Sequence, residues 1–166
     1  MSDYCAAGDL RNLLNEHEYL PEEEAVKFLA EILIAIEDIH KNGIIHRDIK
    51  PENILIDAEG HAKLSDFGLA KEGLFDQQLT KTVLGGGRSY QIPEVLQEKA
   101  YDKSVDIFLF GLLVYELLTG VPAFPFRDNL EEHERRIINC EFAFPGEAGC
   151  DIQEPDVSDE AKSLIR

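Results

Sequence analysis

Polar side chains that could transfer a phosphoryl group lie close together in the first half of the sequence. Asp48, Lys50 and Asn53 belong to the run HRDIKPEN at residues 46–53, and Asp66 follows in a DFG triplet. Phosphoryl transfer requires metal ions on the phosphates, a carboxylate that receives the acceptor proton, and a cation on the moving group. Asp48 could accept the proton, and Lys50 could neutralise the phosphate. Asn53 and Asp66 offer the hard oxygen ligands that magnesium prefers.

These residues match, position by position, the catalytic loop and the magnesium-binding motif of protein kinases. The resemblance extends over essentially the whole chain, and Lys50, two places after Asp48, is typical of the serine/threonine class. Residues 57–72, DAEGHAKLSDFGLAKE, resemble the AGC group and, more loosely, its ribosomal-S6-kinase-like members. The resemblance implies ATP and Mg²⁺ as cofactors, with Asp48 and Lys50 as catalytic residues and with Asn53 and Asp66 as metal ligands.

The same resemblance assigns residues to nucleotide binding. Residues 1–10 are similar to the hinge that joins the two lobes of a kinase, where the backbone at Asp3 and Cys5 would meet adenine. Leu55 resembles the floor below the adenine, and Ser65, beside the metal-binding aspartate, is included in this site.

Two further carboxylates resemble residues that contact ligands in kinases. By this resemblance Asp9 would serve the ribose, and Glu52 would serve a basic side chain of the substrate. The implied partners are therefore protein substrates with serine or threonine near basic residues. Because acidic residues are abundant in this chain, the alternative is that both are ordinary surface acids.

Further residues resemble those that support the kinase site. The tripeptide at residues 92–94, IPE, resembles the APE that closes the activation segment, and Glu94 would pair with an arginine beyond residue 166. Asp106 resembles the aspartate of the central helix. Asp106 precedes the apolar run at residues 107–115. Burying a carboxylate there costs free energy unless it is hydrogen-bonded, so we expect Asp106 to accept from backbone amides of the catalytic loop.

The segment TVLGGGRSY departs from the kinase pattern. Gly87 replaces the threonine that normally contacts the catalytic aspartate and lysine. Thr82 or Thr80 could carry an activating phosphate, added by an upstream kinase. That phosphate would bridge the regulatory cations Arg47 and Lys71 by charge-assisted hydrogen bonds.

Two classes of function stay open. In the first, residues 1–166 are a partial protein kinase domain, comprising the hinge and the C-lobe, in a serine/threonine kinase whose N-lobe and C-terminal end lie outside this chain. The isolated chain would then have little turnover, because the γ-phosphate needs clamping from both lobes. In the second, the altered segment marks a pseudokinase or interaction module.

The elements that must position these residues are mainly helices. Apolar residues at helical spacing predict a buried helix over residues 21–40. Its stripe is Val26, Leu29, Leu33 and Ile36, widened by Phe28, Ile32 and Ile39. A second helix runs from Ser104, as its N-cap, to a stop at Gly120, and shorter helices follow over 129–139 and from Ser158. Short strands are expected at 43–45, 54–56 and 62–64. The fold class is thus mainly α, a kinase-like C-terminal lobe in which a few short strands carry the loops.

Composition narrows the partners. The chain has 166 residues, of which 44% are hydrophobic, and its 33 acidic and 16 basic residues give a formal net charge of -17. Such a charge would repel nucleic acid and anionic lipid, so we expect neither nucleic-acid nor membrane binding. Three irregularly spaced cysteines fit a reducing compartment better than a disulfide framework, which predicts a cytoplasmic or nuclear location.

Overall fold

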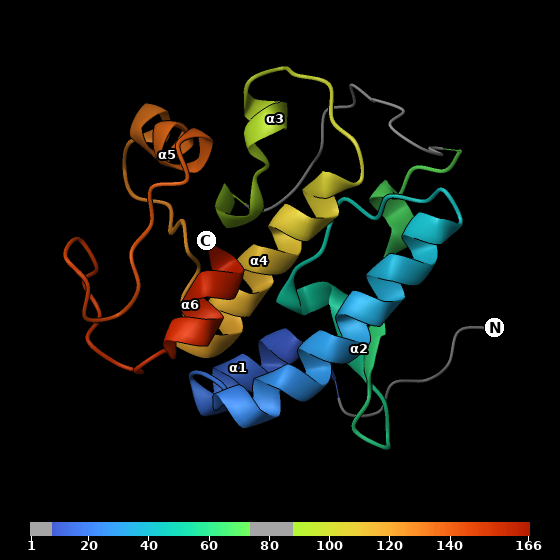
Figure 1. Cartoon of the computed structure of the whole chain (residues 1–166), viewed down its shortest axis with the longest axis horizontal. Coiled ribbons are helices and arrows are strands. Elements are labelled where there is room, and N and C mark those ends of the chain that lie inside the picture. The colour runs from blue at the N-terminus through green and yellow to red at the C-terminus, as the bar shows by residue number, and fades with distance from the viewer. Residues whose placement is uncertain (1–7, 74–87) are drawn as a thin grey trace.

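The computed structural model describes residues 8–73 and 88–166 and confirms the mainly helical fold predicted from the sequence. Among the described residues, no helix has the length and apolar composition to cross a membrane. Figure 1 shows the arrangement of the elements, which are, with 3₁₀ turns as η: α1 Leu10–His17, α2 Glu22–Lys41, η1 Pro51–Asn53, β1 Ile54–Ile56, β2 Ala62–Leu64, η2 Phe67–Leu69, η3 Arg88–Tyr90, α3 Pro93–Leu96, α4 Ser104–Thr119, α5 Leu130–Ile138 and α6 Asp159–Ile165.

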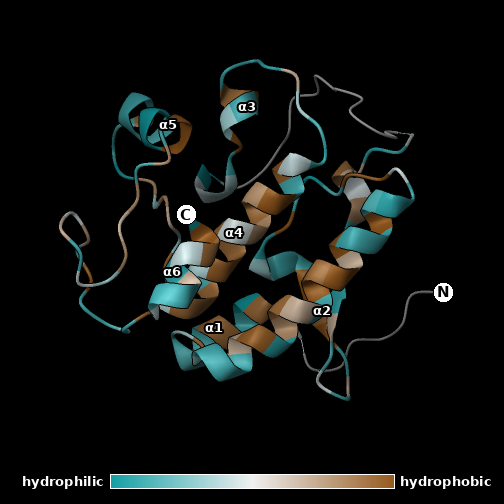
Figure 2. Ribbon diagram, in the orientation of Figure 1, coloured by the Kyte–Doolittle hydropathy of each residue, from teal (hydrophilic) through white to brown (hydrophobic). Residues whose placement is uncertain are grey.

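Helix α4 is the central element, and it packs against α2 and α6 (Figure 1). Its sequence is apolar around most of its circumference, in contrast to the largely polar α5 (Figure 2), so it must be covered on several sides. It ends as predicted at Gly120, whose φ of 77° lies in the left-handed region. A Cβ at this position would lie 2.3 Å from the carbonyl oxygen of Glu18, so the close approach of these two segments requires glycine.

The predicted start of α4 is wrong by one residue. The N-cap position is occupied by Lys103, and Ser104 is already helical. The reason is that the Asp102 carboxylate, and not the serine hydroxyl, caps this end, since it accepts a 2.8 Å hydrogen bond from the backbone N–H of Ser104. Ser158 does cap α6 with its side chain, as predicted, and Asn129 caps α5 in the same way.

Helix α2 forms where it was predicted, but the predicted buried face is partly wrong. Leu29 and Ile36 are buried together with Ala25 and Ile32, whereas Val26 and Leu33 are 61% and 45% exposed. Periodicity located the helix correctly. The residues that contact β2 and α4 are centred about one position away on a wide apolar arc, which periodicity does not resolve.

The two confirmed strands carry the loops of the site. β1 and β2 pair antiparallel, with Ile54 opposite Leu64 and Ile56 opposite Ala62. The strand predicted at 43–45 does not form, and only an isolated bridge between Ile45 and Lys71 is present. The N–H of Ile44 instead donates to the carbonyl of Ile39, closing the end of α2 and leaving too few residues for a strand.

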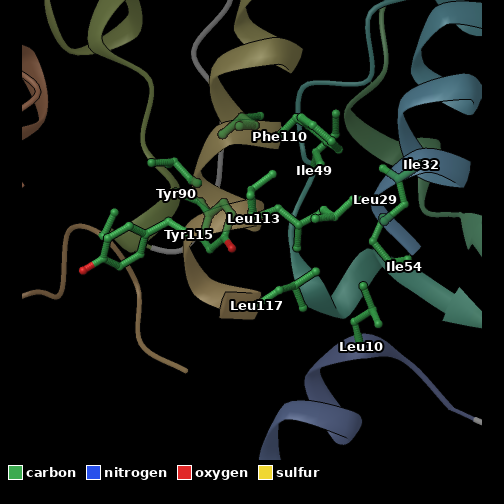
Figure 3. Packing of buried hydrophobic residues seen from close by; sticks show 14 of the residues in the cluster. Leu10, Leu29, Ile32, Ile49, Ile54, Tyr90, Phe110, Leu113, Tyr115 and Leu117 are labelled. Atoms are coloured by element: carbon green, nitrogen blue, oxygen red, sulfur yellow. The ribbon is translucent and has the colours of Figure 1, made fainter. Parts of the chain in front are cut away.

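The core gathers on α4. Leu113 and Leu117 belong to one buried cluster with Leu10 of α1, Ile49 of the loop before η1, and Ile54 of β1 (Figure 3). The loop at residues 46–53 is therefore attached to the core through Ile49, in its middle. Its polar side chains lie on either side of this residue in the sequence.

Candidate active site

The start of the loop at residues 46–53 is hydrogen-bonded to Asp106, near the start of α4. This carboxylate is fully buried, and its two oxygens accept from the backbone N–H groups of His46 at 2.9 Å and Arg47 at 2.7 Å. The ring Nε2 of His40 lies 2.7 Å from one of the same oxygens. The backbone partners predicted for Asp106 are thus confirmed, and they fix the start of the loop to the central helix.

Arg47 connects this loop to the segment after the DFG triplet. Its φ of 69° is unusual for a residue other than glycine, and such a conformation persists only where the surrounding contacts enforce it. Its buried side chain donates from Nε to the carbonyl of Leu69 at 2.6 Å and from Nη1 to the hydroxyl of Tyr101 at 3.1 Å. Arg47 therefore ties residues 46–53 to the neighbouring chain segment.

Asp48, Lys50 and Asn53 form one hydrogen-bonded group. Lys50 Nζ donates to both carboxylate oxygens of Asp48, at 2.8 and 3.0 Å. Asn53 Nδ2 donates to Asp48 Oδ2 and to the Asp48 carbonyl, each at 2.8 Å. Because cation and amide both contact one largely buried carboxylate, its orientation is fixed before any ligand arrives.

His46 supports this group from the interior. Its ring is fully buried, lies edge-on to the Phe67 ring, and has Nε2 2.9 Å from the Ser65 carbonyl. The Asp48 N–H donates to Nδ1 at 3.3 Å, so a neutral ring protonated on Nε2 satisfies both partners. Burial lowers the pKa of His46 and outweighs the opposing effects of the hydrogen bond to the Ser65 carbonyl and of the nearby carboxylates.

The candidate metal ligands come from adjacent loops. Ser65 donates from both its N–H and its hydroxyl to the Asn53 carbonyl, each at 2.9 Å, which brings Asp66 next to Asn53. Asp66 adopts a left-handed φ of 59°, its carboxylate is exposed, and one of its oxygens accepts from the Gly68 N–H. Since the amide nitrogen of Asn53 donates to Asp48, its side-chain oxygen remains for a cation. This pair of hard oxygen donors fits magnesium.

The residues assigned to the nucleotide are only partly described. Asp9 and Leu55 lie opposite each other in an isolated bridge, and Leu55 is half-buried. The Asp9 carboxylate caps α1, accepting from the Asn12 N–H at 2.8 Å. Asp3 and Cys5, also assigned to the nucleotide, lie outside the described residues, as do the predicted phosphorylation sites Thr80 and Thr82.

Glu52 points to a contact that the sequence reasoning missed. Arg11 of α1 donates from Nε to Glu52 at 2.8 Å and from Nη1 to Glu116 of α4 at 2.8 Å. The second oxygen of Glu116 accepts from the hydroxyl of Tyr90 at 2.7 Å. A signal for Glu116 existed, since it is a carboxylate within an apolar helix, but nothing in the sequence identified Arg11 as its partner.

Two predicted residues, Lys71 and Glu94, are not part of the catalytic group. The backbone of Lys71 exchanges both of its hydrogen bonds with Ile45, so that it lies on the same segment that Arg47 contacts. Glu94 occupies the first turn of α3 and is half-buried. The residues predicted to be catalytic and metal-binding thus lie close together, and Lys71 belongs to the neighbouring segment.

Comparison with known proteins places this arrangement in a family. The sequence pattern of the family described as "Protein kinase domain" matches residues 1–166. The chain is 40% identical over 98% of its length to cAMP-dependent protein kinase type 3 of Saccharomyces cerevisiae. It is 41% identical over 86% to a RAC family serine/threonine-protein kinase homolog of Dictyostelium discoideum, and 39% identical over 89% to human ribosomal protein S6 kinase alpha-4.

The chain belongs to the protein kinase family, and its resemblance to AGC-type serine/threonine kinases is confirmed. It spans 38%, 32% and 20% of the lengths of these three relatives. The family in general uses ATP and magnesium.

Proposed function

We propose that the protein containing this chain transfers the γ-phosphate of ATP to serine or threonine hydroxyls of protein substrates. The observation that carries the proposal is the Asp48 carboxylate, held between Lys50 and Asn53 and placed next to Asp66 through the Ser65 contacts. Such an arrangement suits a reaction that depends chiefly on positioning and on charge.

Each residue has a defined role in this proposal. Asp48 orients the acceptor hydroxyl and receives its proton, and Lys50 neutralises charge on the moving phosphoryl group. Asn53 and Asp66 would hold magnesium, which when bound supplies charge neutralisation at the phosphate oxygens. Leu55 would lie below the adenine, with Asp9 and Ser65 near the nucleotide.

Regulation and location belong to the same proposal. An upstream kinase would phosphorylate Thr82 or Thr80, and the phosphate would approach Arg47 and Lys71. The cytoplasm or nucleus is the proposed location. Basic residues near the acceptor, expected from the sequence, would require Glu52 to be available to a substrate cation, and Arg11 already contacts that carboxylate.

A pseudokinase or interaction module is the second candidate. The observation that favours it is Gly87, where kinases usually have a threonine that contacts the catalytic pair. This position lies outside the described residues, so the argument for it comes from the sequence. The intact group of Asp48, Lys50 and Asn53 favours the enzyme.

Replacement of Asp48 by Asn decides between the two. We expect Asp48→Asn, in the natural full-length protein, to lower phosphate transfer at least about a hundredfold, because the shape stays while the proton acceptor is lost. The measurement is transfer of radiolabelled phosphate from ATP to a serine and threonine peptide library. Asp128→Asn, an exposed position before α5, is the matched control and should retain activity. A wild-type protein as inert as its Asp48→Asn variant would support the pseudokinase.

A further inference from the structure

Arg11 occupies a position between two carboxylates from distant parts of the chain. Its guanidinium joins Glu52, which follows the catalytic Lys50 by two residues, to Glu116, near the end of α4, with both distances at 2.8 Å. Glu116 is 1% exposed, and its other oxygen is taken by Tyr90. The carboxylates that could receive a substrate cation are therefore already paired within the chain.

The contact of Arg11 with Glu116 is difficult to break. Removing the partner of a buried carboxylate leaves an uncompensated charge, which is strongly unfavourable. Burial opposes the charge of Arg11, but its hydrogen bonds to Glu116 and Glu52 outweigh burial and raise the pKa of the guanidinium. Burial and the Glu116 carboxylate also raise the pKa of Tyr90 well above its ordinary value, so its hydroxyl remains a donor. A substrate cation that binds Glu52 or Glu116 would therefore have to displace the Arg11 guanidinium from its hydrogen bonds.

The pocket in front of Arg11 adjoins the catalytic loop. It is an open cavity of about 450 Å³, lined by Arg11, Lys50, Glu52, Asn53, Arg88, Ser89, Tyr90 and Pro122. Three of these residues are cations and one is an anion. Lys50 is directed to Asp48, while the Arg88 guanidinium lies 4.2 Å from the centre of the Phe126 ring. Arg11 and Lys50 are thus held by carboxylates, whereas Arg88 contacts an aromatic ring and Ser89 adds a hydroxyl to the lining.

We propose that Arg11 determines substrate specificity: it takes the place of a substrate cation at Glu52 and Glu116, so the pocket beside Asp48 prefers an acidic to a basic side chain on the acceptor peptide. This inference rests on the proposed kinase function and names the substrate class of the same site. Specificity here has two sources: Arg11 occupies Glu52 and Glu116, which are then not available to a basic side chain, and Arg88 can attract a carboxylate.

The overall charge of the chain acts in the opposite direction, but at longer range. The formal net charge of -17 would disfavour acidic peptides in general. Exposed charges more than about 8–10 Å apart are largely screened at physiological salt, whereas contacts inside the pocket are not. The position of the acidic residue on the peptide should therefore matter more than the total peptide charge.

The test compares peptides that contain one acceptor serine and differ at a single flanking position, which carries glutamate, alanine or arginine. For the natural full-length protein we expect one flanking position at which kcat/KM is about tenfold higher for glutamate than for arginine. Arg11→Met should reverse this ratio, because Glu52 and Glu116 then become available to arginine. Since Arg11→Met leaves Glu116 buried and unpaired, the double variant Arg11→Met, Glu116→Gln provides the same test without that charge.

The matched control is Arg135→Met on α5, which removes an arginine that likewise bridges two glutamates but lies outside the pocket. It should keep the wild-type preference. Peptide binding by fluorescence anisotropy is measured on the same proteins, so that a protein inert in phosphate transfer, which would defeat the proposed function, still reports the preference of the pocket. A wild-type preference for arginine, or a preference unchanged in the double variant, would overturn the role of Arg11.

Discussion

Asp106 contributes to the site without facing the pocket. It accepts from two successive backbone amides of the catalytic loop and also contacts His40. Only a carboxylate supplies acceptors on both of its oxygens, and the buried position makes each unmade hydrogen bond costly. Through these contacts Asp106 holds the backbone immediately before Asp48, including the left-handed conformation of Arg47.

Replacing Asp106 by Asn should therefore destabilise the protein although the two side chains have nearly the same shape. The NH2 group of asparagine is a donor and would face a backbone N–H, so one of the two hydrogen bonds to the loop is lost. We therefore expect a loss of about 1–3 kcal/mol in the free energy of unfolding. Urea unfolding followed by circular dichroism gives this value. Asp38→Asn, on the exposed side of α2, is the control and should change little. Equal stabilities of the two variants would contradict the role given to Asp106.

The sequence predicted the group of residues that lie in one run, and it also predicted the distant contact of Asp106 with the catalytic loop. It missed the distant contact of Arg11 with Glu116. Asp48, Lys50 and Asn53 fall within one run, and local turns bring them together. The Arg11 to Glu116 contact spans 105 residues. The cost of burying a carboxylate predicts that Asp106 and Glu116 need partners. It does not identify Arg11, because several cations could satisfy it before the helices are placed.

At the scale of elements, α4 determines the arrangement. Its nearly continuous apolar run predicted a buried helix, and the structure confirms it. The weaker prediction was the face of α2, where Val26 and Leu33 proved to be exposed. A helix buried on most sides needs no choice of face, whereas a helix buried on one side does. Sequence periodicity was therefore sufficient for α4 and insufficient for α2.

A large-to-small change in α4 tests its place at the centre. Leu113 is fully buried beside Ile49 and Ile54 in the cluster of Figure 3, so Leu113→Ala should cost about 2–5 kcal/mol through lost burial and the cavity it leaves. The urea midpoint should fall while the slope stays constant. Leu164→Ala, at a residue 71% exposed on α6, is the matched control and should shift stability by no more than about 0.5 kcal/mol. Similar losses in both variants would refute a core centred on α4.

At the scale of the whole molecule, contacts from three distant segments converge on α4. Asp106 near its start holds the catalytic loop, Leu113 in its middle lies in the core, and Glu116 near its end receives Arg11. The polar contacts of the site therefore depend on the same helix as the apolar core. Loss of the loop's buried hydrogen bonds should accordingly lower the stability of the whole protein as well as its activity.

Acidification tests this dependence, because His46 belongs to the loop and its ring contacts Ser65 and Phe67 of the DFG segment. Burial holds its pKa below the ordinary value near 6.5, so the unfolded chain binds a proton more readily than the folded one. The stability that neutral His46 provides is fully present above about pH 6.5 and is lost as the pH falls below it. Protonation would also place an N–H on Nδ1 against the N–H of Asp48.

We therefore expect the free energy of unfolding of the wild type to fall more steeply between pH 7.5 and 5.5 than that of His46→Gln, over the range set by the ordinary histidine pKa of about 6.5. Glutamine can accept and donate in the same region but does not titrate. Urea unfolding at a series of pH values measures both slopes, and the paired groups elsewhere, such as Glu31 with His61, cancel in the difference. His17→Gln, at an exposed position at the end of α1, is the matched control and should follow the wild type. If the His46→Gln protein lost stability as steeply as the wild type, the buried neutral ring would not be what couples the loop to the fold.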